Sequence, residues 1–236
     1  MMRPSLFRSK SEAGNMLIYI LGAVFLMGIL IVILKGNSQE GSGIDGEKLT
    51  VRATEVQRYA AELERGVRYV LQNGNSESDV RFAHPDSIVN YGLITSIPAR
   101  QVFDPQGGGV EYKEPPAGVN DGTQWQFYAT THIPDMGTDT AAQSKAELVA
   151  VLPNVTNSFC SQLNRNVGQV IDLSVDTDPA ANGCINDTPN PFTGTYGYGA
   201  GNNTLDSTKF SKLPPTEACI RCNGGTYQYY RVLLGR

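Results

Sequence analysis

Four cysteines are the residues of this sequence whose type and spacing most directly suggest chemistry. Two of them form the motif Cys219-Ile-Arg-Cys222, which has the C-x-x-C spacing of thiol–disulfide oxidoreductases. Such a redox motif needs its first cysteine at a helix N-terminus, where the pKa of the thiol falls. Here Pro214-Pro215 precedes the motif, and Asn223-Gly-Gly-Thr follows it as a turn before a predicted strand. The motif therefore favours a structural disulfide over redox or zinc chemistry.

The other two cysteines are Cys160 and Cys184, so the count is even. An even count fits two disulfides formed in an oxidising compartment. Four cysteines allow three pairings. The most local pairing joins Cys160 to Cys184 and Cys219 to Cys222, whereas the crossed pairings would tie the loop around Cys184 to the C-terminal strand. All three pairings stay open at this point.

Other candidate chemistry is weak. Four aspartates lie loosely together in one loop: Asp172, Asp176, Asp178 and Asp187. They could offer oxygens to calcium, but they lack the glycine placement and terminal glutamate of an EF-hand loop, and a solvated loop explains them better. The two histidines, His84 and His132, stand near prolines and are expected to flank turns. Because no G-x-S-x-G, H-E-x-x-H or P-loop motif occurs, the sequence predicts a protein that is not an enzyme and needs no cofactor or metal.

Composition limits the class of protein further. The chain has 236 residues, of which 40% are hydrophobic and 18% charged, with a net charge of −4. This balance is too apolar for a disordered chain. It also lacks the basic excess with which proteins neutralise phosphates, so nucleic acid is not an expected partner.

The most informative segment is an apolar run near the N-terminus. Nineteen residues from Met16 to Leu34 carry no charge, and as a helix they would be ~28 Å long, close to the ~30 Å hydrocarbon core of a bilayer. A cleavable secretory signal is the competing interpretation, but its apolar region is ~7–15 residues and ends in a small-x-small site. The run exits instead through Leu34-Lys35-Gly36-Asn37. We therefore predict a retained transmembrane helix over residues 15–35.

Flanking charge predicts the orientation of this helix. The leader, residues 1–14, has three basic side chains against one acid, whereas acids dominate after Lys35. The positive-inside rule then keeps the N-terminus in the cytoplasm and exports everything after Lys35, as a single-pass membrane protein.

The exported part begins with a Gly/Ser-rich linker, residues 36–46. A long amphipathic helix follows over residues 47–73, and Gly74 ends it. Its apolar stripe is Leu49, Ala53, Val56, Ala60, Leu63, Val67 and Val70. This stripe is expected to pack on the domain's own sheet. The alternative is that the helix packs against other subunits, where Ala53 and Ala60 would permit close approach. Both interpretations hold if the helix uses one face for the sheet and another for a neighbouring subunit.

Beyond this helix the apolar pattern changes to that of strands. Strands are predicted at residues 109–113, 124–131, 146–152 and 226–234, with a short helix over 156–167 closed by Gly168. Short connections favour an antiparallel sheet with the long helix on one face, which is an α+β fold. Residues 174–217 are rich in Thr, Asn, Gly and Pro, and predict a long, partly ordered functional loop.

This order of features resembles the type IV pilin-like family, including the pseudopilins of secretion systems. A narrower likeness to pilin-like proteins of alphaproteobacteria rests on four stretches: Val102-Phe-Asp-Pro-Gln-Gly-Gly-Gly-Val110, Leu152-Pro-Asn-Val155 with Cys160, Phe192-Thr-Gly-Thr-Tyr196 and Tyr229-Tyr-Arg-Val-Leu-Leu-Gly-Arg236. The resemblance implies cleavage by prepilin peptidase between Gly14 and Asn15, methylation, a pilin-like fold and filament assembly. It also implies a place in the bacterial inner membrane, with the N-terminus cytoplasmic and the C-terminal domain periplasmic. Without that family, Gly14-Asn15 is a helix start with Asn15 as N-cap.

Tyr19 stands where the family usually has a glutamate in its mature chain, and this favours a minor subunit over a major one. The predicted function is a minor pilin or pseudopilin-like subunit of a type IV pilus or type II secretion-type filament. Its expected partners are the lipid bilayer, other pilin-like subunits and prepilin peptidase. The alternatives are a membrane-anchored periplasmic binding or adhesion module that forms no filament, and an anchored thiol oxidoreductase.

Overall fold

The computed structural model describes residues 18–28, 42–87, 91–92, 97–137, 146–169, 185, 191–197, 203–222 and 224–236. The chain divides into two compact units, Met1–Glu47 and Lys48–Arg236. In the first unit residues 18–28 are helical with exposed side chains. Within the described ranges, no helix is both long enough and apolar enough to cross a bilayer. The ends of the predicted span, Met16 and Leu34, lie outside those ranges.

The long amphipathic helix is α2, Ser42–Gln72. It begins at Ser42 rather than at Glu47, so the last residues of the predicted 36–46 linker are helical. It ends as predicted, because Gly74 adopts φ 86° and its N–H bonds to the carbonyl of Leu71. A left-handed residue just past a helix satisfies the last carbonyls, and glycine adopts that conformation without steric cost.

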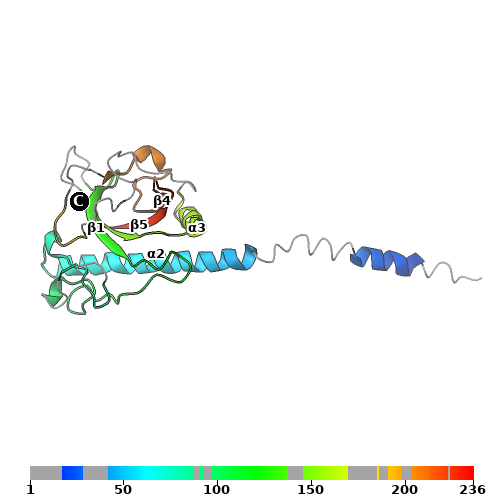
Figure 1. The fold of residues 1–236 in the computed structure, drawn as a ribbon, viewed down its shortest axis with the longest axis horizontal. Helices are drawn as coiled ribbons and strands as arrows, with labels where there is room; N and C mark the ends of the chain where they lie inside the picture. Colours follow the sequence, from blue (N-terminus) through cyan, green and yellow to red (C-terminus); the bar gives the residue numbers. More distant parts are fainter. Residues whose placement is uncertain are drawn as a thin grey trace, which may run out of the picture. The chain divides into compact units, whose positions relative to one another are not determined.

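The sheet confirms the α+β class and its antiparallel core (Figure 1). Its strands are β1 Gln126–His132, β2 Glu147–Leu152, β3 Asn203–Thr204, β4 Glu217–Arg221 and β5 Tyr227–Leu234. The order is β3-β1-β2-β5-β4, and every neighbouring pair is antiparallel except β3 with β1. The predicted strand at 109–113 is wrong, since that segment is irregular.

Both faces of the sheet are buried, which explains why all of β2 is apolar or enclosed. On one face Leu148, Ala150 and Leu152 share a core with the apolar stripe of α2. On the other face Val149 and Val151 pack with Ile185. Ile185, a described residue of the predicted 174–217 loop, thus contributes to the core.

Helix α3 spans Asn157–Val167 and packs on the same sheet face as α2. Thr156 caps it by accepting a hydrogen bond from the Phe159 N–H, and Gly168 closes it at φ 76°, as the sequence predicted. Short 3₁₀ turns occur at Glu77–Asp79, Pro98–Arg100 and Ser207–Lys209.

The segment 110–119, part of which was predicted as a strand, instead follows one flank of α2. The Lys113 N–H donates to the Tyr59 hydroxyl at 2.9 Å, and its Nζ lies 3.0 Å from a Glu62 carboxylate oxygen. At Gly66 a Cβ would collide with Val110. The segment therefore lies close to the helix, where glycine is required.

Candidate functional site

The sequence pattern of helix α2 suggested two roles, packing on the domain's own sheet and contact with other subunits. Leu49 is partly buried and the other six residues of the apolar stripe are buried in the core of their own domain. Ala53 and Ala60 have no exposed surface, so the prediction that they form a seam with other subunits is wrong. Among the described side chains of α2, a contact with another molecule has to use residues outside this apolar stripe.

The opposite face carries an ordered set of side chains, which we call the exposed stripe: Val51, Glu55, Arg58, Glu62, Arg65 and Tyr69. Five of these six residues are exposed and Glu62 is half-buried. Their spacing of four and three residues keeps them in one line along the helix. Val51 and Tyr69 at its two ends are apolar or aromatic, and 66% and 51% of their surface is exposed. The charges between them alternate in sign, and Arg58 lies 4.0 Å from Glu62.

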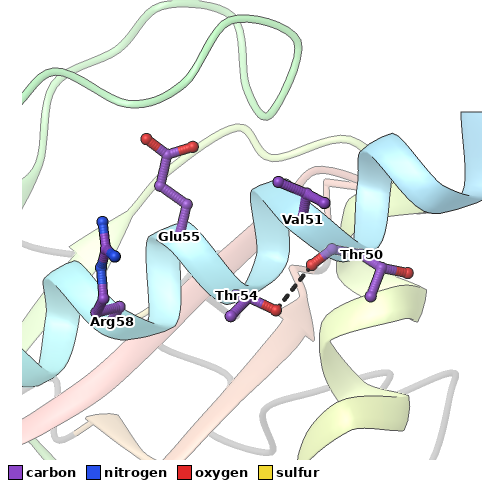
Figure 2. Close-up of a pocket in the computed structure, with 5 residues that line it drawn as sticks. All are labelled: Thr50, Val51, Thr54, Glu55 and Arg58. Carbon is purple, nitrogen blue, oxygen red and sulfur yellow. Dashed lines mark hydrogen bonds between the residues drawn. The ribbon is translucent and has the colours of Figure 1, made fainter.

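A shallow hollow of about 410 Å³ lies over one end of this stripe. Thr50, Val51, Thr54, Glu55 and Arg58 line it, all from α2. Figure 2 shows Glu55 and Arg58 projecting from the helix beside Val51, while the Thr54 hydroxyl turns back to the Thr50 carbonyl at 2.9 Å. The hollow thus combines one exposed apolar side chain with one acid and one base.

The sheet holds α2 in place through a polar network that the sequence analysis missed. Arg231 of β5 contacts Glu64 of α2 at 2.8 Å and Glu217 of β4 at 3.1 Å. Glu217 also accepts hydrogen bonds from Gln57 and from the Tyr229 hydroxyl. A partly buried arginine with two carboxylates and further hydrogen bonds fixes the rotation of α2, so the exposed stripe points away from the sheet.

Of the predicted span, residues 15–35, the structure describes residues 18–28, which include Tyr19. These residues are helical, and the Tyr19 side chain is 71% exposed. Gly14, Asn15, Met16 and Leu34 lie outside the described residues. Cleavage at Gly14-Asn15 and the membrane span therefore stay predictions.

The cysteines form a structural staple in a pairing different from the most local one. Cys160 of α3 is bonded to Cys219 of β4, with a Cα–Cα distance of 5.2 Å. The pairing of Cys160 with Cys184 and of Cys219 with Cys222 is therefore wrong. Cys222 is also disulfide-bonded, and Cys184 lies outside the described residues. Cys219 lies within strand β4 and not at the N-terminus of a helix, which is where a redox C-x-x-C motif places its first cysteine.

A side chain of α3 reinforces the same junction. The Asn164 amide donates to the Cys219 carbonyl at 2.7 Å, and its oxygen accepts the Cys219 N–H at 2.8 Å. Strand β4 is the last of the described strands in the sheet order, so Asn164 satisfies backbone groups on the side of β4 that faces away from β5. The sequence pattern predicted this helix and its closing Gly168 but gave no sign of this asparagine.

Both histidines flank turns as predicted, yet both are largely enclosed. His84 stacks on Tyr112 with ring centroids 3.6 Å apart, and burial lowers its pKa. His132 ends β1, and its Nδ1 lies 3.5 Å from an oxygen of Glu147. Glu147 has no exposed surface, and its other oxygen accepts the Ile133 N–H at 2.7 Å.

Burial raises the pKa of Glu147, although the Ile133 N–H and the neighbouring His132 act in the opposite direction. The sequence analysis missed this residue because it was read as the start of an apolar strand. In the parts of the chain that the structure describes, no group of three or more His, Cys, Asp or Glu residues could hold a metal. The four loop aspartates lie outside those parts.

Comparison with known proteins identifies no relative. No family model matches the chain, and neither the curated proteins nor the solved structures contain a significant match.

Proposed function

We propose that the chain is a membrane-anchored, pilin-like assembly subunit, a minor pilin or pseudopilin-like component of a type IV pilus or type II secretion-type filament. One observation carries the proposal. A long helix, α2, packs its apolar stripe on an antiparallel sheet, and an uncharged apolar run of nineteen residues precedes it in the chain. That order provides an anchor, a helical stem and a compact head in one polypeptide.

The physical role of the apolar run depends on what surrounds it, first lipid and then neighbouring subunits. Before assembly, lipid would cover residues 16–34, where a helical backbone would satisfy its own hydrogen bonds. In a filament, the runs of neighbouring subunits would cover one another and contribute to cohesion. Tyr19 offers no carboxylate to pair with a neighbour's terminal amine inside lipid, so this chain suits a minor position.

Processing is the sharpest test of this proposal. The full chain is co-expressed with a prepilin peptidase, and the intact mass and N-terminal sequence of the product are measured. We expect a product that begins at Asn15. Gly14→Leu should abolish the shortening, whereas Gly22→Leu, the same change within the apolar run, should leave it intact. An unshortened wild-type chain would rule out pilin maturation and favour an anchored binding module.

A further inference from the structure

The exposed stripe of α2 is complementary to itself when one copy is reversed. From its N-terminal end it reads apolar, acid, base, acid, base, aromatic. Two such helices in antiparallel orientation, centred at the level of Ala60, place Val51 opposite Tyr69, Glu55 opposite Arg65 and Arg58 opposite Glu62. Every charge then faces the opposite charge, and each apolar end faces the other.

The alternative orientation lacks this match. Two parallel copies in register place Glu55 against Glu55 and Arg65 against Arg65, and like charges at close range are unfavourable. The charge order therefore selects the antiparallel arrangement. In that arrangement the contact has two-fold symmetry, so each pair of residues occurs twice along ~27 Å of helix.

The hollow on α2 supplies a place for the largest side chain of the stripe. It lies beside Val51, which is where the antiparallel register places Tyr69 of the second copy. Tyr69 has half of its surface exposed, so it is available to fill that hollow. Burying an exposed aromatic ring against Val51 and the threonine methyl groups adds apolar contact to the charge pairs.

We propose that the exposed face of α2 is a self-association surface on which two copies of this chain pair antiparallel, with Tyr69 of each entering the hollow beside Val51 of the other. The existing contacts of Glu62 with Arg58 and Lys113 are compatible with this, because a carboxylate accepts several hydrogen bonds. The inference does not rest on the proposed function, since it uses only residues of the Lys48–Arg236 unit.

Charge reversal tests the pairing. Sedimentation velocity of the full chain in detergent micelles, over a range of concentrations, should show a monomer–dimer equilibrium. Glu55→Arg and Arg65→Glu should each weaken the dimer about tenfold or more, because each puts like charges in contact at two symmetric positions. The double variant restores both pairs and should recover the wild-type dissociation constant. Arg165→Glu, the same charge change at an exposed position of α3, is the control.

Cysteine crosslinking tests the direction. A mixture of Val51→Cys and Tyr69→Cys chains, distinguished by tags of different mass, should form a mixed disulfide dimer, and neither variant alone should crosslink efficiently. Crosslinks within each variant alone would mean a parallel contact and overturn the proposal. So would a chain that stays monomeric at all concentrations, or a double charge variant that does not recover. The peptidase assay is unaffected by any of these results, so the two proposals fail separately.

Discussion

Glu147 is a charged residue type whose burial the polarity pattern of the sequence does not predict. It occupies the first position of β2, has no exposed surface, and meets His132 and the Ile133 N–H. A buried carboxyl is more easily kept neutral than ionised, because the interior solvates a charge poorly. The raised pKa of Glu147 therefore makes the stability of the fold depend on pH.

The sign of that dependence follows from where the proton binds more tightly. Since the folded pKa of Glu147 is raised, the unfolded chain releases this proton first as pH rises, and the contribution of Glu147 to stability declines between the unfolded and folded pKa values. We expect Glu147→Gln to remove this decline. Urea denaturation at intervals from about pH 4 to about pH 7 measures it. The exposed Glu111→Gln is the control, and equal pH slopes for wild type and Glu147→Gln would contradict the prediction.

At the scale of elements, the edge of the sheet depends on contacts from α3 rather than on another strand. The Asn164 side chain makes two hydrogen bonds to the backbone of Cys219, next to the disulfide that joins the same two elements. These bonds replace the ladder that a neighbouring strand would form on β4. Helix α3 is thus attached to β4 at Cys219 both by a disulfide and by hydrogen bonds.

Asn164→Ala should therefore lower the free energy of unfolding by about 2–4 kcal/mol, because it leaves a buried N–H and a buried carbonyl without partners while the disulfide is intact. Urea denaturation under non-reducing conditions measures the change. Asn166→Ala, on the exposed side of the same helix, should stay within about 0.5 kcal/mol of wild type. A loss of similar size in both variants would contradict the prediction, because alanine favours a helix more than asparagine does and the buried contacts of Asn164 would then carry no extra stability.

At the scale of the whole molecule, the staple between α3 and β4 joins parts of the chain that lie far apart in sequence. The two cysteines are separated by 59 residues, including the described part of the 174–217 loop. In the chain-entropy model, closing a loop of that length restricts the unfolded chain by about 4 kcal/mol. The disulfide therefore stabilises the domain chiefly by limiting its unfolded states.

Replacing Cys160 and Cys219 together by serine should lower the free energy of unfolding by about 4 kcal/mol in urea. Non-reducing peptide mapping of the wild-type chain should yield a Cys160–Cys219 peptide. It should also yield a Cys184–Cys222 peptide, because Cys222 is bonded and Cys184 is the remaining cysteine. A disulfide between Cys222 and a second chain would contradict the predicted Cys184–Cys222 bond. A serine variant as stable as the wild type would contradict the predicted loss of stability.

Much of the architecture follows from local sequence pattern. The 4-3 spacing of apolar residues predicts α2 and its buried face, Thr156 and Gly168 bound α3, and alternating or apolar runs predict β1, β2 and β5. These predictions succeed because helix caps and periodic burial are encoded within a few neighbouring residues. The segment 109–113 fails because its apolar and aromatic residues pack on a helix rather than pair with a strand.

What the sequence alone determines is therefore the periodic part of the protein: an uncharged apolar run, a two-faced helix, and strands that need cover on a sheet. The tertiary structure decides the cysteine pairing, the burial of Glu147, the Asn164 contact and the direction in which the exposed stripe of α2 faces. Each of these features depends on contacts between residues that are distant in sequence. The packing of helices on the sheet brings those residues together, so the spacing of neighbouring residues in the sequence does not predict the contacts.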